Sequence, residues 1–244
     1  MHCKFGLFDG RLQLNAATFY YDYTDKQILG AINDFVFGSL PAFVNVPDSH
    51  VIGFEVSAAW EPIDGLLISP SISYADSEID GEFRNFDPVL NNSTKDFVGE
   101  PFPNAPKWQS NIGVQYEWQV RSDMTAFVGG NYNYQSATKG FSYDRCAEPA
   151  GAIDPVSGNV VTCTKDFLGA NPDFYGDTDL AIPSRGLLDL WAGVQTGPWR
   201  IWAWGRNVTD DYYWNQVQHV NDVLLRYAGM PVTYGISVSH RSGE

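Results

Sequence analysis

The feature that most constrains this chain is a period-two alternation of apolar and polar residues that recurs along its length. In residues 108–118, asparagine, glutamine, glycine and glutamate fill one parity. The other parity carries, besides one serine, Trp108, Ile112, Val114, Tyr116 and Trp118. Successive side chains of a β-strand point to opposite faces, so this pattern predicts a strand with one apolar and one polar face. A soluble β-sandwich alternates in the same way, so alternation alone leaves both classes open.

The tryptophans at the two ends of residues 108–118 favour a membrane strand. Ten residues at about 3.4 Å each, tilted by about 45°, rise roughly 24 Å, close to the height of the apolar band of an outer-membrane barrel. Each tryptophan then falls at a lipid–water interface, where an amphipathic ring is most stable. We expect interface positions for seven aromatic residues of this parity: Trp60, Tyr74, Trp108, Trp118, Tyr132, Tyr134 and Tyr234.

Further segments repeat the alternation, which predicts an all-β, antiparallel transmembrane β-barrel segment of about eight strands. The expected strands cover residues 12–23, 52–60, 66–74, 108–118, 124–135, 188–195, 199–208 and 232–239. A change of apolar parity at Ala16 and Ala17 predicts a bulge there. Pro70 predicts a bulge or a local break, because proline cannot donate to the ladder. In residues 199–208 both parities carry tryptophan, so the lipid face of that strand stays open.

The connections between these strands alternate in length. Short turns fall at residues 61–65, 119–123 and 196–198, and long polar stretches fall at residues 26–49, 75–106, 136–185 and 209–231. Bacterial barrels have short periplasmic turns and long extracellular loops. The first strand therefore runs outward and the last runs inward.

The composition excludes several classes of protein. Aromatic residues make up 15% and charged residues 18% of the chain, with 23 glycines, which suits strands rather than helices. No apolar run is long enough for a membrane helix. No signal peptide precedes the first strand pattern, so we expect a barrel fragment whose N-terminal part is missing. The net charge of −14 argues against a nucleic-acid partner.

Three segments resemble the β-barrel of TonB-dependent outer-membrane receptors. They are LQLNAATFYYDYTDKQI at residues 12–28, WGRNVTDDYY at residues 204–213 and MPVTYGISVSHR at residues 230–241. The resemblance implies a 22-stranded barrel in the bacterial outer membrane, in contact with outer-membrane lipid and filled by an N-terminal plug. Such a receptor takes up a scarce nutrient, most often a ferric siderophore, with energy from the TonB complex.

On this resemblance, residues 1–244 supply about the last eight strands, without the plug or the N-terminal segment that contacts the TonB complex. The family's last strand usually ends in an aromatic residue that the barrel-assembly machinery reads. Here His240 stands where a tyrosine often lies, and no aromatic residue ends the chain. This departure predicts impaired assembly or an altered C-terminus.

The last long loop holds the best candidates for ligand contact. They are Tyr212, Tyr213, Trp214, Asn215, Gln216 and Gln218, because aromatic rings and amides together suit the face of a catecholate, an aryl group or a sugar. The alternative interpretation places the rings of Tyr212, Tyr213 and Trp214 in the interface belt or in loop packing. No catalytic or metal-binding motif is present, because the histidines are scattered, so we expect no enzyme, cofactor or metal.

Cys146 and Cys163 share one polar stretch. A disulfide between them would suit an oxidising compartment, and two unpaired thiols are the alternative.

Two other classes of protein stay open. A self-contained eight-stranded barrel would serve as an adhesin, a small pore or a structural protein, and a soluble β-sandwich or lectin-like module is the third class. Six small residues on the polar parity would leave a narrow barrel underfilled and suit a wide one better. They are Gly53, Ser57, Gly113, Gly129, Gly193 and Gly235.

Overall fold

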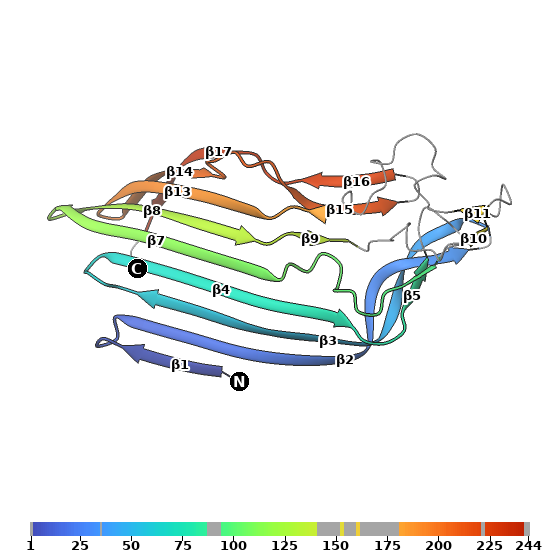
Figure 1. Cartoon of the computed structure of the whole chain (residues 1–244). Helices are drawn as coiled ribbons and strands as arrows, with labels where there is room; N and C mark the ends of the chain where they lie inside the picture. Colours follow the sequence, from blue (N-terminus) through green and yellow to red (C-terminus); the bar gives the residue numbers. More distant parts are fainter. Residues whose placement is uncertain are drawn as a thin grey trace.

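The computed structural model describes residues 2–34, 36–86, 94–140, 152–153, 160–161, 181–220 and 223–241. Nine antiparallel strands form one curved sheet in which each strand neighbours the next along the chain (Figure 1). These strands are β1 (His2–Leu7), β2 (Leu12–Asp34), β3 (Gly38–Trp60), β4 (Leu66–Ile79), β7 (Trp108–Arg121), β8 (Met124–Gln135), β13 (Arg185–Thr196), β14 (Trp199–Arg206) and β17 (Thr233–His240). The expected all-β, antiparallel fold is confirmed.

In the described parts of the connections there are four short two-stranded sheets. They are β5 (Arg84–Phe86) with β6 (Thr94–Asp96), β9 (Thr138–Lys139) with β12 (Ala181–Ile182), β10 (Ala152–Ile153) with β11 (Val160–Val161), and β15 (Trp214–Val220) with β16 (Val223–Ala228). Within the described ranges, no helix is both long and apolar enough to span a membrane.

The large sheet is open at both edges. Within the described part of the chain, β1 pairs only with β2 and β17 pairs only with β14. The described strands therefore form a curved wall rather than a closed eight-stranded barrel, and they lack the two facing sheets of a β-sandwich. The strand count is nine rather than eight because β1, which lies before the first expected strand, joins the sheet.

The first long connection differs most from the expectation. Residues 26–49 were expected to form a loop, but β2 and β3 pair almost continuously from Lys26 with Val46 to Asp34 with Gly38. The physical reason is burial, because Ile28, Val44 and Val46 pack in an apolar cluster beyond the end of the sheet.

Two irregularities predicted from the sequence have different outcomes. The pairing of β2 with both neighbours runs without a shift through Ala16 and Ala17, so the predicted bulge is wrong. Alanine is small enough to lie on either face. At Pro70 the β3–β4 pairing omits Ala58 and Ala59 and resumes in the same register, so the local break is confirmed. The three short turns are also confirmed.

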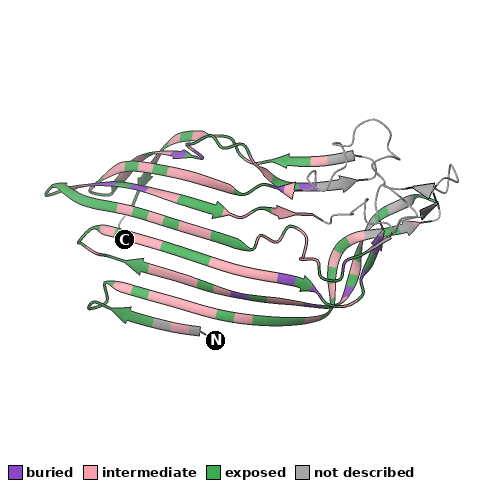
Figure 2. Cartoon of the chain, in the orientation of Figure 1, coloured by how far each residue is buried: buried purple, intermediate pink, exposed green. Residues whose placement is uncertain are grey.

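The two faces of the sheet differ in chemistry. Figure 2 shows bands of exposed and partly buried residues along the wall strands. One face, called here the apolar face, exposes Ile52, Ile72, Ile112, Val128, Leu190 and Val238. Soluble proteins rarely expose so continuous an apolar surface, whereas lipid covers it readily. Strand pairing also resolves the two-sided β14: Trp199 and Ile201 lie on the apolar face, and Trp202 and Trp204 lie on the opposite, polar face.

Among the described residues, the largest buried cluster lies where the outer ends of β3 and β4 meet the connection after β4. Val46, Ile79, Phe83 and Phe97 are buried together, and Phe102 packs against them. This cluster holds the β2–β3 extension together with Phe83, Phe97 and Phe102 at one end of the sheet, which we call the loop end. The opposite end carries the short turns and is called the turn end.

Candidate functional site

The seven predicted interface aromatics all lie on the apolar face, by strand register. Trp60 and Trp118 lie toward the turn end, and the other five lie toward the loop end. At the loop end the ring centroids of Tyr74 and Trp108 are 4.7 Å apart, and at the turn end those of Tyr116 and Trp118 are 5.4 Å apart. Their contact with a lipid–water boundary stays a prediction.

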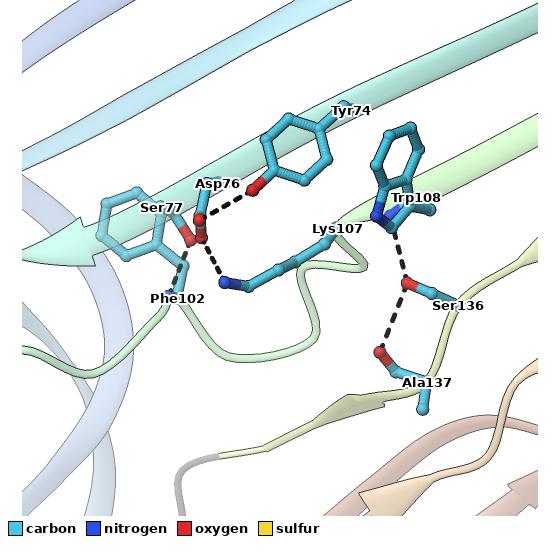
Figure 3. A network of polar contacts seen from close by, with 8 residues as sticks. All are labelled: Tyr74, Asp76, Ser77, Phe102, Lys107, Trp108, Ser136 and Ala137. Atoms are coloured by element: carbon cyan, nitrogen blue, oxygen red, sulfur yellow. Dashed lines mark hydrogen bonds and ion pairs between the residues drawn. The ribbon is translucent and has the colours of Figure 1, made fainter.

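A polar network lies directly beyond the loop-end aromatics (Figure 3). The Asp76 carboxylate accepts a hydrogen bond from the Tyr74 hydroxyl at 2.9 Å and forms an ion pair with Lys107 at 2.7 Å. The ammonium of Lys107 lowers the pKa of the Asp76 carboxyl, and Asp76 raises the pKa of Lys107. Beside this pair, the Phe102 amide donates to the Ser77 hydroxyl at 3.0 Å. These contacts connect the loop after β6 to the end of β4.

A second set of polar contacts joins β3 to the segment between β4 and β5. His50 Nδ1 lies 2.7 Å from an Asp80 carboxylate oxygen, and the Asp80 amide donates to the Asp48 carbonyl at 2.9 Å. The hydrogen bond to Asp80 raises the pKa of His50 above its ordinary value of 6.5. The ion pair therefore stabilises the folded loop fully below pH 6.5 and loses this effect as the pH rises through the raised pKa.

We expect the His50 imidazole to titrate with a midpoint above 6.5 in the folded protein, because Asp80 favours its charged form. Nitrogen-15 NMR of the histidine rings in detergent micelles measures this midpoint. Asp80→Asn serves as the control and should lower the midpoint. A midpoint at or below 6.5, or one that the control leaves unchanged, would contradict the assigned ion pair.

The loop after β14 turns at a buried asparagine. Asn207 is 4% exposed and has a positive φ of 48°. Its side-chain amide donates to the carbonyls of Asp211 at 2.9 Å and Met230 at 3.2 Å, and its side-chain oxygen accepts from the Asp211 amide at 3.0 Å. Its own amide donates to the Asp189 carboxylate at 2.9 Å. The asparagine of the WGRNVTDDYY segment therefore holds the corner from which the last loop departs.

The six predicted ligand-contact residues follow that corner and differ in their surroundings. Tyr212 is 75% exposed, and its ring meets Trp214 edge to face at 4.9 Å. Trp214 packs against the buried Ile182 and Val217. Asn215 and Gln216 are exposed at the start of β15, and the Gln218 side chain lies outside the described residues. Contact with a ligand stays a prediction for all six, and Tyr212 is the most accessible ring.

Arg185 joins this loop to the wall, and no sequence pattern marked it. Its guanidinium donates to the Trp214 carbonyl at 3.0 Å, to the Asn215 side-chain oxygen at 3.1 Å and to the Gln135 side-chain oxygen at 3.1 Å. It also lies 4.7 Å from the centre of the Tyr213 ring. The arginine thereby bonds to β8 and β15 from the first residue of β13. These contacts bridge 28 to 50 positions, which a local pattern cannot reveal.

The polar face forms a hollow of about 750 Å³ beside Arg185. Amide, hydroxyl and small side chains dominate its lining, which includes Asn15, Ser57, Ser71, Ser73, Gln109, Asn111, Asn133 and Gln135. Arg185 and Glu55 contribute the charges. The Asn111 amide donates to Asn131 at 2.7 Å and to Asn133 at 2.6 Å, so the amides bond along neighbouring strands. Such a surface can hydrogen-bond water, a second polypeptide or a polar ligand.

Aromatic rings occupy the space beside several glycines of the polar face. The directly paired residues are Phe19 with Gly53, Trp191 with Gly129, Phe127 with Gly193 and Trp204 with Gly235. A Cβ at any of these four glycines would overlap the neighbouring side chain. Each glycine therefore makes room for a cross-strand ring, and the face is more filled than the glycines alone suggest.

The remaining sequence predictions concern metals and cysteines. Among the described residues, no group of three or more His, Cys, Asp or Glu side chains is arranged to hold a metal ion. Cys146 and Cys163 lie outside the described residues, so their pairing stays a prediction. Cys3 is a free cysteine.

The chain resembles, in structure, the ferric yersiniabactin uptake receptor FyuA of Yersinia pestis, with a TM-score of 0.65 and 16% identity over 98% of this chain and 29% of that one. It resembles the ferric preacinetobactin receptor BauA of Acinetobacter baumannii, with a TM-score of 0.59 and 23% identity, over 96% of this chain and 28% of BauA. It also resembles the copper transporter OprC, with a TM-score of 0.60 and 16% identity, over 98% of this chain and 30% of OprC.

These likenesses establish the fold, and the chain spans under a third of the length of each of the three proteins. A search of curated proteins found no match. The family model described as "TonB dependent receptor-like, beta-barrel" matches residues 4–208, which is most of the chain. The chain therefore belongs to the β-barrel family of TonB-dependent receptors, whose members lie in the bacterial outer membrane.

Proposed function

We propose that residues 1–244 form the last strands of a 22-stranded TonB-dependent receptor that takes up a ferric siderophore. The observation that carries this proposal is the open, nine-stranded wall with one apolar and one polar face. An open edge exposes unpaired backbone groups, which lipid cannot satisfy, so β1 and β17 need further strands beside them. The apolar face then meets lipid, and the hollow of the polar face meets the lumen.

The ligand class rests on the relatives and on the outer loop. FyuA and BauA are receptors for ferric chelates, and this chain is similar to both in fold. The exposed ring of Tyr212, next to Trp214 and the amide of Asn215, offers stacking and hydrogen bonds at the loop end. The plug and the contact with the TonB complex would come from the part of the receptor before these strands. Assembly of the barrel would use the barrel-assembly machinery.

The size of the protein in the membrane tests the first half of the proposal. An antibody against a peptide of residues 97–107 should detect an outer-membrane protein roughly three to four times as large as 27.2 kDa, since relatives are that much longer. A single band near 27 kDa would overturn the large receptor and favour a self-contained barrel. Heating the sample before electrophoresis serves as the control for folded barrels.

Uptake of radioactive iron tests the second half. Deleting the gene should abolish energy-dependent uptake of at least one ferric siderophore from a panel, and restoring the gene should recover it. Uptake should also stop when the inner-membrane proton gradient is collapsed. Because OprC is a copper transporter, a parallel assay with radioactive copper is the matched alternative. If the deletion leaves iron uptake unchanged and abolishes copper uptake, the proposed substrate is copper and not a ferric siderophore.

A further inference from the structure

Arg185 lies where the last loop, the wall and the hollow meet. Its guanidinium Nη1 donates hydrogen bonds to the Trp214 carbonyl at 3.0 Å and to the Asn215 side-chain oxygen at 3.1 Å. Nη2 donates to the side-chain oxygen of Gln135 at 3.1 Å. Gln135 is the direct partner of Arg185 in the β8–β13 pairing, and both residues line the hollow. One planar group therefore ties two consecutive residues of the loop to the rim of the hollow.

The Tyr213 ring connects Arg185 with the returning half of the same loop. The centre of the ring is 4.7 Å from the guanidinium carbon, within the range of a cation–π interaction. The Gly229 amide donates to the Tyr213 carbonyl at 2.8 Å, and the Met230 amide donates to the Tyr213 hydroxyl at 3.3 Å. A Cβ at Gly229 would overlap the ring. Tyr213 thus joins the two halves of the loop, and Arg185 links it to β13.

The hairpin that follows depends on such contacts for its position. β15 and β16 form a two-stranded sheet that, in the described part of the chain, does not pair with the strands of the wall. A hairpin of two strands is only marginally stable by itself. Trp214 packs against Val217 and against Ile182 of β12, which also lies outside the wall sheet. The bonds from Arg185 therefore set where Trp214 and Asn215 lie relative to the hollow.

This placement concerns the ring pair that the last loop offers to a ligand. Tyr212 is 75% exposed and meets Trp214 edge to face at 4.9 Å. Arg185 holds the main chain of Trp214 and the side chain of Asn215 directly beside this pair. A ligand that meets side chains already in place does not bear the entropic cost of ordering them.

We propose that Arg185 is a positioning residue that raises ligand affinity by holding the Tyr212–Trp214 ring pair in place beside the hollow. The inference rests on the proposed uptake of a ferric siderophore and adds a structural requirement for it. Arg185 acts here through the loop and not by contact with the ligand. A residue needed only for folding would instead change the number of folded receptors and leave the affinity of each unchanged.

Two substitutions separate the shape of the Arg185 side chain from its charge. Arg185→Gln removes both the charge and the fork of nitrogens. Arg185→Lys keeps the charge, but its single nitrogen cannot serve Gln135 on one side and the loop on the other. The matched control is Arg200→Gln, because Arg200 lies on the same polar face toward the turn end and also contacts a ring, that of Phe127 at 4.1 Å.

Hydrogen–deuterium exchange of residues 214–220 in the full receptor reports on the loop without any ligand. Binding isotherms on outer membranes give the Kd and the number of sites per folded receptor for two probes. The probes are iron-55 enterobactin, a catecholate, and iron-55 desferrioxamine B, a hydroxamate. Folded receptor is quantified by electrophoresis with and without heating.

We expect both Arg185 variants to exchange faster than the wild type at residues 214–220. Their Kd for a probe that the wild type binds should rise about five- to thirtyfold, the cost of ordering about two side chains on binding, with an unchanged number of sites per folded receptor. Arg200→Gln should match the wild type in exchange and in Kd.

Unchanged exchange in Arg185→Gln would overturn the proposal. So would a wild-type Kd in this variant, even with less folded receptor, because Arg185 would then serve folding alone. A wild-type Kd in Arg185→Lys would also overturn it, because charge alone would suffice. If the wild type binds neither probe, uptake of these two siderophore classes is refuted, and the exchange rate alone supports or overturns the placement of the loop by Arg185.

Discussion

Replacing Gly193 by alanine is expected to destabilise the wall by about 1–3 kcal/mol, the cost of overpacking a filled site. A Cβ at this position would overlap the carbonyl oxygen of Ile201 and come within 2.7 Å of the Phe127 ring. This carbonyl belongs to β14, which pairs with β13, and it cannot move without disturbing the backbone pairing of the two strands. The melting temperature of the protein in detergent, followed by circular dichroism, should fall accordingly.

Gly113→Ala is the matched control for this prediction. Gly113 lies on the same polar face, but the nearest atom to an added Cβ is an Asn131 oxygen at 3.5 Å, an ordinary contact. Alanine should therefore be tolerated there, or even stabilise the strand, because it reduces the freedom of the unfolded chain. Equal melting temperatures for the two variants would show that close approach does not govern these glycines.

Asn207→Ala is expected to cost about 3 kcal/mol of the free energy of unfolding. The change removes three side-chain hydrogen bonds from a buried site and leaves the Asp211 amide and the Asp211 and Met230 carbonyls without these partners. It also places alanine at a positive φ. We expect a lower midpoint of thermal unfolding and faster proteolysis of the last loop.

Asn104→Ala separates the two causes. Asn104 has a similar φ of 57°, but its side chain is exposed, so alanine there should cost only the backbone strain, about 1 kcal/mol. The difference between the two variants measures the hydrogen bonds of the Asn207 corner. If both variants lose the same stability, the side-chain bonds contribute nothing and the corner is held by its backbone.

The candidate site was only partly visible in the sequence. Clustered aromatics and amides pointed to the last loop, and the structure places Tyr212 exposed and Trp214 packed within it.

The wall of this protein follows from its sequence, because a strand has a side-chain period of two and one face must suit lipid. Alternation, the terminal tryptophans and the short turns therefore predicted eight of the nine wall strands and the apolar faces of most of them, whereas β1 and the lipid face of β14 came from the strand pairing. The structure at the outer end of the wall could not be predicted from the sequence and depends on tertiary contacts. Residues 26–49 form paired strands because Val46 is buried with Ile79 and Phe97, which are distant in sequence, and Ile28 packs against this cluster. Arg185 likewise gained its role from partners on β8 and β15. The local alternation of residues determines which face of a strand is apolar, whereas burial between segments distant in sequence determines which connecting residues form strands.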